Sequence, residues 1–231
     1  MQLSQFRAVL FDKDGTLFDF SASWSGWAAG FLEDLSQGDD ALADQLAEAI
    51  IYDRQAGQFD PASPVIAGTL EETADLLTPH LPHLTRAGLT SYLLQTASAA
   101  QMVPPVPLDP LLSRLSSQGL VLGVATNDGE APARAHLTRA GVLARFAHIL
   151  GYDSGYTPKP APDMLLGFAD RAGLAPGAVV MVGDSTHDLI AGRAAGMATV
   201  GVLTGLAGAD MLAPHADIIL PDIGHLADLI G

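Results

Sequence analysis

The second half of this 231-residue sequence alternates between short apolar runs and segments whose apolar residues recur at helical spacing. Apolar runs occur at residues 120–125, 146–150, 179–182, 198–203 and 217–220, and helical patterns occur at 130–140, 162–172 and 189–195. Such alternation predicts a parallel sheet with helices on both faces, a Rossmann-like α/β fold. Because ligands of these sheets bind at the carboxyl ends of the strands, the residues that follow each apolar run are the candidates for function.

Residues 18–102 differ from the rest, because strand-like runs are absent there and helical periodicity dominates. Leucine and alanine recur at helical spacing in 42–50 and 70–77, and Thr69 with Glu72 has the pattern of a capping box. A proline-rich connector follows at 104–107. We therefore expect an inserted α-helical cap domain at 18–102 and a core domain formed by 1–17 and 103–231.

The charge balance narrows the classes of partner. The sequence has 11 Lys+Arg and 26 Asp+Glu, a formal net charge of -15, so its surface repels nucleic acid and anionic membrane lipids. It contains no cysteine, and it begins without a signal-peptide pattern. The uncharged run at 194–209 is short for a membrane span and contains four glycines. We expect a cytoplasmic protein that binds neither nucleic acid nor membrane.

The apolar run at 8–11 ends in two acids, Asp12 and Asp14, followed by Gly15 and Thr16. Side chains two residues apart in an extended strand share a face, so these carboxylates would repel each other unless a cation or a proton lay between them. A turn with solvated acids is the alternative explanation. The pattern favours a functional role for the two carboxylates at the carboxyl edge of the sheet.

Polar residues also follow two later segments. Thr126 and Asn127 follow the run at 120–125 and could donate hydrogen bonds to an anion, although a capped turn explains them as well. Lys159 is one of only two lysines and lies between Pro158 and Pro160. The restricted backbone positions its ammonium group at a low entropic cost, so a merely solvated side chain is the less favoured interpretation.

The run at 179–182 leads into Asp184 and Asp188. Asp188 has an alternative role, because Ser185 with an acid three residues later is a helix-start signature. Asp184 has no such explanation. Together Asp12, Asp14 and Asp184 would form an oxygen-only site of the kind that Mg²⁺ prefers.

Taken in order, these segments resemble the four motifs of the haloacid dehalogenase-like hydrolase superfamily. The resemblance is strongest to its phosphoglycolate phosphatase-like members with a helical cap. It spans essentially the whole chain, and it rests on residues 12–16, 126–127, 159–163 and 183–188. It implies a Mg²⁺-dependent phosphatase of small phosphorylated metabolites that works through an aspartyl-phosphate, with phosphoglycolate as the leading substrate.

The resemblance also implies a role for each residue. Asp12 would be the nucleophile and Asp14 the acid/base, with Mg²⁺ held by Asp12, the main-chain carbonyl of Asp14 and Asp184. Lys159 and Thr126 would stabilise the transferring phosphoryl group, and Thr126, Asn127 and Lys159 would bind the substrate phosphate. Asp188 would join the metal site through water or Lys159.

Two features separate the chain from neighbouring branches of the superfamily. Dehalogenases lack the second acid of the first motif, so Asp14 favours phosphoryl transfer. Phosphonatases use a cap lysine, and residues 18–102 contain none. Lys13 departs from the family pattern, which often has an apolar residue there. We expect it to lie beside the cap with its ammonium group near the mouth of the site.

Substrate choice in this family lies in the cap. We expect the loop at 57–69 to close over the site, with Arg54 and the groups near Ser63 and Gly68 binding a carboxylate such as that of phosphoglycolate. An ion pair between Arg54 and a surface acid is an equally weighted alternative. At the level of function, a phosphomutase of the β-phosphoglucomutase type and a non-catalytic binding protein on the same fold remain the alternatives to a phosphatase.

Overall fold

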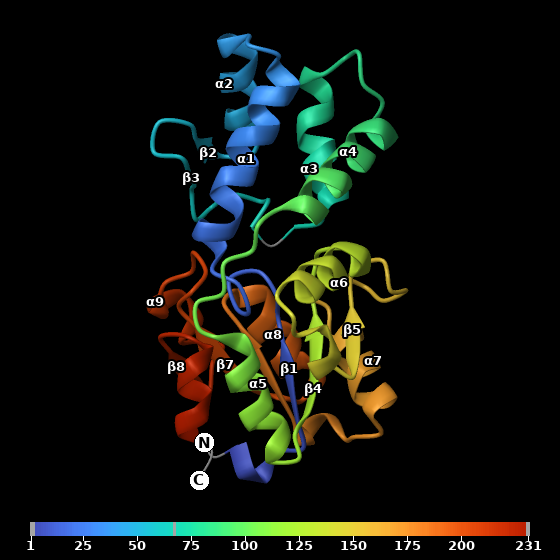
Figure 1. Cartoon of the computed structure of the whole chain (residues 1–231), viewed down its shortest axis with the longest axis vertical. Helices are drawn as coiled ribbons and strands as arrows, with labels where there is room; N and C mark the ends of the chain where they lie inside the picture. The colour runs from blue at the N-terminus through green and yellow to red at the C-terminus, as the bar shows by residue number, and fades with distance from the viewer. Residues whose placement is uncertain (1–2, 67, 230–231) are drawn as a thin grey trace.

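The computed structural model describes residues 3–66 and 68–229. Its centre is a six-stranded parallel sheet in the order β5-β4-β1-β6-β7-β8 (Figure 1). The strands are β1 (Ala8–Phe11), β4 (Val121–Ala125), β5 (His148–Leu150), β6 (Val179–Gly183), β7 (Ala198–Val202) and β8 (Ile218–Leu220). The predicted α/β class and the strand positions are confirmed.

The position of β1 explains why its sequence is apolar throughout. It lies between β4 and β6, where Ala8 is in register with Val121 on one side and Val179 on the other. All four of its residues are buried, as is usual for a parallel strand covered on both faces. The carboxyl ends of β4, β1 and β6 therefore lie next to one another, and Asp12 follows β1 at the middle of this edge.

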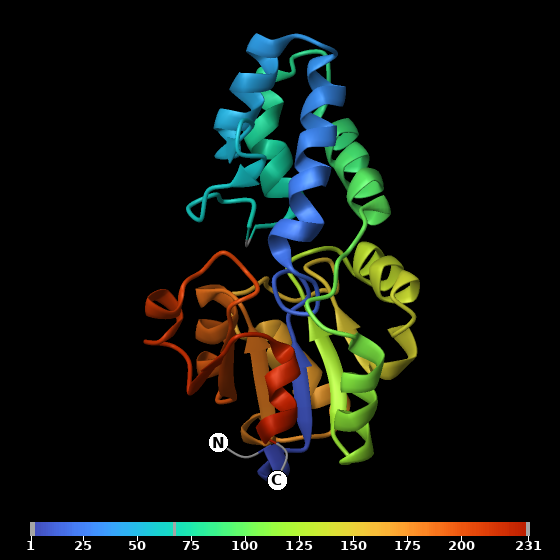
Figure 2. The same ribbon diagram turned by 60° about the vertical axis from the view of Figure 1, so that its left-hand side comes forward.

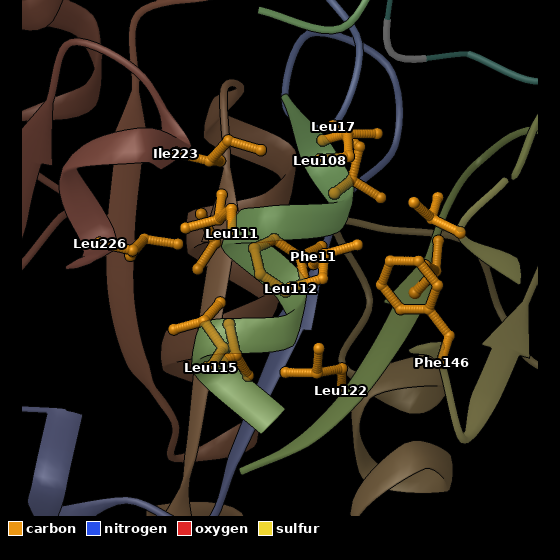
Figure 3. Close-up of a cluster of buried hydrophobic side chains, with 14 of the residues drawn as sticks. Phe11, Leu17, Leu108, Leu111, Leu112, Leu115, Leu122, Phe146, Ile223 and Leu226 are labelled. Carbon is orange, nitrogen blue, oxygen red and sulfur yellow. The ribbon is translucent and has the colours of Figure 1, made fainter. Parts of the chain in front are cut away.

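Helices cover the sheet on two faces, and the side chains of β1 alternate between the two layers. Val9 and Phe11 join the cluster formed with α5 (Leu108–Ser117) and α6 (Glu130–Arg139), part of which Figure 3 shows. Ala8 and Leu10 join the opposite cluster, formed with α7 (Asp163–Ala172) and α8 (Thr186–Ala195). A short helix, α9 (Ala209–Leu212), precedes β8. β1 is therefore packed on both faces of the sheet, which holds its carboxyl end in a fixed position.

Four helices form a separate layer beyond the carboxyl ends of the strands (Figures 1 and 2). They are α1 (Phe20–Ser36), α2 (Asp40–Ala49), α3 (Leu70–Leu77) and α4 (Arg86–Ala99). We call the segment that runs from α1 to α4 the helical insert. Its buried residues form a hydrophobic cluster of their own, which runs from Phe20 to Ala100. Thr69 and Glu72 form the capping box predicted at the start of α3. The domain boundaries at 17/18 and 102/103 stay a prediction.

The insert also contains a feature that the sequence did not lead us to expect. β2 (Tyr52–Asp53) and β3 (Gln58–Phe59) pair antiparallel, a short ribbon within the expected helical cap that the helical periodicity did not predict. The ribbon forms because the rings of Tyr52 and Phe59 pack 5.0 Å apart across it, and Phe59 also packs on Phe20. Across the residues that are described, no helix is long and apolar enough to cross a membrane.

Candidate active site

Asp12, Asp184 and Asp188 gather at the carboxyl ends of β1 and β6. Each offers a carboxylate oxygen within 4.8 Å of the others, and all three side chains are buried. Asp184 follows β6 directly, and Asp188 lies in the first turn of α8, where its backbone N–H and carboxylate complete a capping box with Ser185. The register of neighbouring parallel strands therefore brings together acids that are 172 to 176 residues apart in the sequence.

Lys159 supplies the positive charge in this cluster. Its Nζ donates to Asp12 Oδ1 and to Asp188 Oδ1, both at 2.6 Å, and the residue is 4% exposed. Burial alone would lower the pKa of Lys159, but Asp12 and Asp188 raise it above the usual value, so the ammonium form is held. The prediction that Lys159 lies at the site is therefore consistent with its geometry.

Three carboxyl groups, those of Asp12, Asp184 and Asp188, share the single positive charge of Lys159. Burial raises the pKa of Asp12 to about 7, with Lys159 opposing the shift and Asp188 and Asp14 adding to it. Burial, followed by the charges of Asp188 and Asp12, also raises the pKa of Asp184 well above its usual value. Three buried carboxylates facing one ammonium group have a donor set that suits a hard divalent cation such as Mg²⁺.

Two glycines permit the chain to close around Asp184. A Cβ at Gly15 would lie 2.2 Å from Asp184 Oδ2, and one at Gly205 would lie 1.7 Å from the same atom. Gly15 also has φ +82°, a conformation that side-chain-bearing residues rarely adopt. Thr16 Oγ1 donates to the other oxygen, Asp184 Oδ1, at 3.2 Å. The Gly-Thr pair after Asp14 therefore serves to enclose this carboxylate.

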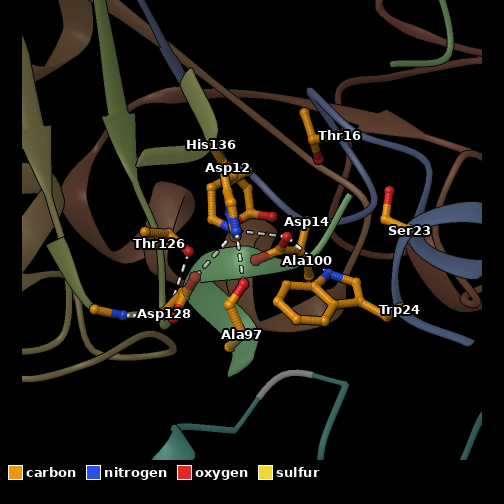
Figure 4. Close-up of polar contacts among 12 residues, drawn as sticks. Asp12, Asp14, Thr16, Ser23, Trp24, Ala97, Ala100, Thr126, Asp128 and His136 are labelled. Carbon is orange, nitrogen blue, oxygen red and sulfur yellow. Dashed lines mark hydrogen bonds and ion pairs between the residues drawn. The ribbon is translucent and has the colours of Figure 1, made fainter. Parts of the chain in front are cut away.

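Asp14 lies outside the cluster of three acids. Its Oδ1 accepts hydrogen bonds from Lys13 Nζ at 2.7 Å and from Trp24 Nε1 at 2.8 Å, and Figure 4 shows the Trp24 ring beside Asp14. Asp14 also lines the pocket above Asp12. A role for its side chain as a metal ligand, as in our sequence-based set of Asp12, Asp14, Asp184 and Asp188, therefore has no support in this geometry. The expectation that its main-chain carbonyl binds the metal stays a prediction.

Lys13 lies beside the insert, as expected, with Nζ 5.2 Å from the centre of the Trp24 ring, but it is buried and does not reach the mouth of the site. The residue is fully buried, with Nζ 2.7 Å from Asp14 Oδ1 and 3.1 Å from Asp128 Oδ2. The contact with Asp128 brings opposite charges together without the alignment of a hydrogen bond. Burial would lower the pKa of Lys13, but Asp14 and Asp128 raise it, so the residue stays charged.

The two residues after β4 make hydrogen bonds to the main chain around the site. Asn127 makes two hydrogen bonds with the main chain of Lys159, donating from Nδ2 to its carbonyl at 2.8 Å and accepting from its N–H at 2.9 Å. Thr126 Oγ1 accepts from the N–H of Asp128 at 3.0 Å. Both residues also line the pocket, so their contact with a substrate stays a prediction.

Of the three cap residues proposed for the carboxylate, Arg54 and Ser63 lie away from the pocket above Asp12 and Gly68 lines it. Arg54 is bound by Asp40 and Asp44 on the surface, which was the alternative considered from the sequence, and it does not line the pocket above Asp12. The Ser63 hydroxyl donates to the carbonyl of Ile50 inside the insert. Gly68 does line the pocket.

Sequence reasoning missed the residues of the insert that face the acids. Phe20, Trp24, Trp27, Phe59, Val65, Ile66, Leu70 and Thr73 line the pocket, together with Gly68 and Thr69. We call these ten residues the insert wall. The two tryptophans of the sequence, three positions apart on α1, were the available signal. Asp128 and His136, which surround Lys13, carried no signal because they lie far from it in the sequence.

The comparisons with known proteins agree on one family. The family model of the haloacid dehalogenase-like hydrolases matches residues 6–196, a range that contains all four motifs. A Dickeya dadantii protein named probable phosphatase IndB is 33% identical over 88% of this chain and 84% of its own length. A phosphoglycolate phosphatase of Xanthomonas campestris is 33% identical over 93% of this chain and 91% of its own.

Solved structures show the same fold. An HAD phosphatase from Thermococcus onnurineus superposes with a TM-score of 0.70 at 24% identity, covering 97% of this chain and 98% of its own. A β-phosphoglucomutase from Clostridium difficile superposes with a TM-score of 0.67 at 16% identity, covering 96% of this chain and 93% of its own. At these identities the likeness concerns the fold and does not separate the two activities.

Proposed function

Because the chain belongs to the haloacid dehalogenase-like hydrolase family, we propose that it is a phosphatase that cleaves small phosphate monoesters in two steps through Asp12. The observation that carries this proposal is the buried group of Asp12, Asp184 and Asp188 around Lys159. The names of the two relatives support phosphate monoesters as the substrate class.

In the first step Asp12 attacks phosphorus, an Asp12 O–P bond forms, and the P–O bond to the leaving alcohol breaks. Lys159 occupies Asp12 Oδ1 and so leaves the second oxygen of this carboxylate to attack. Asp14 in its protonated form gives its proton to the departing oxygen. In the second step the Asp14 carboxylate takes a proton from water, the water oxygen bonds to phosphorus, and the Asp12 O–P bond breaks, which restores the Asp12 carboxylate and releases inorganic phosphate.

We propose that Asp12, Asp184 and Asp188 hold Mg²⁺, for which their oxygen-only, net-negative arrangement is suited. When bound, the ion neutralises part of the repulsion between an anionic nucleophile and an anionic phosphate. Lys159 also reduces this repulsion, because its ammonium group lies next to the attacking carboxylate of Asp12.

A hydrolysis screen tests the proposal. Phosphate release is measured across a panel of monoesters with Mg²⁺ and after chelation, with phosphoglycolate as the reference substrate because one relative carries that name. The proposal predicts Mg²⁺-dependent release from at least one monoester and none from the Asp12→Asn variant. Absence of release across the panel in the folded, Mg²⁺-loaded protein would contradict it and would favour a non-catalytic binding protein.

A phosphomutase is the second candidate, because the β-phosphoglucomutase structure shares the fold. The two activities differ in what accepts the phosphoryl group from Asp12, a second sugar hydroxyl or water. Product analysis with a sugar 1-phosphate separates them, since a mutase yields the 6-phosphate isomer whereas a phosphatase yields free sugar and phosphate.

A further inference from the structure

The pocket above Asp12 has two chemically distinct halves. Its core half carries five carboxylates, from Asp12, Asp14, Asp128, Asp184 and Asp188, and the Lys159 ammonium group, together with Thr126, Asn127, Ser185 and His187. The insert wall carries no charged residue, and seven of its ten members are apolar or aromatic. A phosphate monoester has its phosphoryl group at the acids and Lys159, so its alcohol portion would contact the insert wall.

Most polar groups of the insert wall are already used within the protein. Trp24 Nε1 donates to Asp14, and Trp27 Nε1 donates to Thr96 Oγ1 at 3.1 Å. The Thr73 hydroxyl donates to the carbonyl of Thr69 at 3.2 Å. The main-chain N–H groups of Gly68 and Thr69 are likewise bonded to Pro64 and Glu72. These five donors are therefore not available to a polar leaving group.

Among the residues that the structure describes, a carboxylate at this wall would meet no cationic side chain. The nearest candidate, the N-terminus of α3 at Leu70, already carries Glu71 and Glu72 in its first turn, and these acids repel an anion. Burying a carboxylate without a cation or a hydrogen bond is costly, whereas contact of an apolar group with the wall is favourable. Aromatic side chains such as Trp24, Trp27 and Phe59 also pack favourably against a ring.

Building on the proposed function, we propose that the preferred substrates are phosphate monoesters of apolar alcohols, with an aromatic or branched aliphatic group against the insert wall. Small anionic substrates such as phosphoglycolate are then poor substrates. The wall selects by burying apolar surface and because its described residues offer no cationic side chain to an anion.

The test compares benzyl phosphate with phosphoglycolate, which both release a primary alcohol and so need similar chemistry. We expect kcat/KM for benzyl phosphate to exceed that for phosphoglycolate about tenfold or more. In Val65→Arg, which places a cation on the half-buried wall, the ratio should fall by about tenfold or more in favour of phosphoglycolate. Arg54→Ala is the matched control, because Arg54 lies outside the pocket, and its ratio should be unchanged.

Faster turnover of phosphoglycolate by the unmodified protein would overturn this inference while leaving the phosphatase proposal intact. His187, whose buried Nδ1 has no partner among the described residues, would then be the group to examine for carboxylate binding. Failure to hydrolyse either ester or any other monoester would instead contradict the proposed function itself.

A second, independent observation concerns Lys13. Its ammonium group is enclosed by Asp14, Asp128 and His136 and lies 5.2 Å from the centre of the Trp24 ring. An ammonium group only donates, so His136 Nδ1, 3.1 Å away, must accept, and His136 Nε2 carries the hydrogen donated to the Ala97 carbonyl at 2.8 Å. Lys13 thus links the turn after β1 to α6 and, through His136 and Trp24, to α4 and α1 of the insert.

This enclosure distinguishes the two oxygens of Asp14. Oδ1 accepts from both Lys13 and Trp24, whereas Oδ2 accepts no hydrogen bond from the described residues. Oδ2 is therefore the oxygen that is able to exchange a proton with a leaving group or water. Two donors from different segments, the turn after β1 and helix α1, fix the rotation of the carboxylate about its Cβ–Cγ bond.

We infer that Lys13 is a positioning residue for the acid/base chemistry of Asp14, an inference that also rests on the proposed function. It acts by holding Oδ1 so that Oδ2 faces the substrate. Trp24, on α1 of the insert, donates the second hydrogen bond to Oδ1 and so also helps to orient the Asp14 carboxylate.

The dependence of activity on the leaving group tests this role. p-Nitrophenolate leaves without a proton, whereas the alkoxide of benzyl phosphate needs one. In Lys13→Met, kcat/KM for benzyl phosphate should fall at least about tenfold more than kcat/KM for p-nitrophenyl phosphate. Trp24→Phe, which keeps a ring and removes the indole donor, should show a smaller effect of the same kind and serves if Lys13→Met does not fold. Equal losses for both esters in the folded variants would overturn the inference.

Discussion

Lys159 and Asp12, 147 residues apart, form a buried ion pair with 2.6 Å between Nζ and Oδ1. Asp12 follows the central strand, and Lys159 lies in a proline-rich loop whose main chain Asn127 holds. The same Lys159 ammonium group also forms an ion pair with Asp188, so it contacts two carboxylates. The consequences of this arrangement can be measured.

Removing the ammonium group should impair phosphoryl transfer strongly. In Lys159→Met we expect kcat/KM to fall by about 10²–10³-fold, because the developing charge loses a preorganised partner. Steady-state assays in saturating Mg²⁺ measure the change. Lys159→Arg keeps the charge with a different shape and is the comparison. A loss below threefold in Lys159→Met would contradict a role for this residue in the reaction.

Asn127 should act through the position of Lys159. Asn127→Ala removes both hydrogen bonds to the Lys159 main chain, so we expect kcat to fall by about 10- to 100-fold. The amide proton of Lys159 should also exchange faster with solvent, which hydrogen exchange followed by mass spectrometry of this loop detects. Unchanged exchange with reduced activity would instead indicate that Asn127 contacts the substrate directly.

Divalent cations should stabilise the folded protein through the acid cluster. At a Mg²⁺ concentration 100 times the dissociation constant, the stabilisation is about 2.7 kcal/mol. A rise in Tm on adding Mg²⁺ to chelated protein measures it. In Asp184→Asn the rise should be largely lost, whereas Asp210→Asn, an exposed substitution on α9, should keep it. Equal rises in the two variants would exclude Asp184 as a ligand.

His136 should make stability depend on pH. Burial, followed by the charge of Lys13, lowers the pKa of His136 to about 4, below the usual value near 6.5. Between these values the unfolded chain binds a proton that the folded protein does not, so stability falls as the pH falls from 6.5 toward 4, by up to about 3 kcal/mol. Denaturant unfolding from pH 4.5 to 7.5 measures the slope. His136→Gln should have a shallower slope, and an identical slope would contradict the assignment.

Arg54 should not affect substrate binding. Its guanidinium is bound by Asp40 and Asp44 at the surface of the insert, and an exposed pair of this kind contributes little. We therefore expect Arg54→Ala to leave KM unchanged for phosphoglycolate and for benzyl phosphate. A KM raised fivefold or more for the acidic ester alone would show that the arginine does reach the substrate.

The sequence allowed the prediction of the sheet and of the acids at its edge for a physical reason. The apolar runs that form β1, β4 and β6 are followed directly by candidate site residues, as with Asp12 after β1 and Asp184 after β6. All strands of a parallel sheet end at the same edge, so these acids are expected at one edge of the sheet whatever the order of the strands. Lys159 could be recognised because prolines surround it and lysine is rare in this chain.

The remaining features depend on contacts between distant segments. Lys13 is buried because Asp128 and His136, from the β4 end and α6, provide a polar environment that its neighbours in the sequence do not indicate. The surface ion pair of Arg54 depends on how α2 packs beside β2. The insert wall likewise arises from α1, β3 and the start of α3 converging over Asp12. Periodicity within each segment carries no information on such convergence.

The central claim is that Asp12 receives the phosphoryl group, and rapid acid quench during the first turnover tests it most directly. Mass spectrometry of the peptide that contains Asp12 should then show one added phosphoryl group, absent in Asp12→Asn, which should be folded and inactive. A phosphoryl group on a different residue, or turnover by Asp12→Asn at the rate of the unmodified protein, would contradict the account.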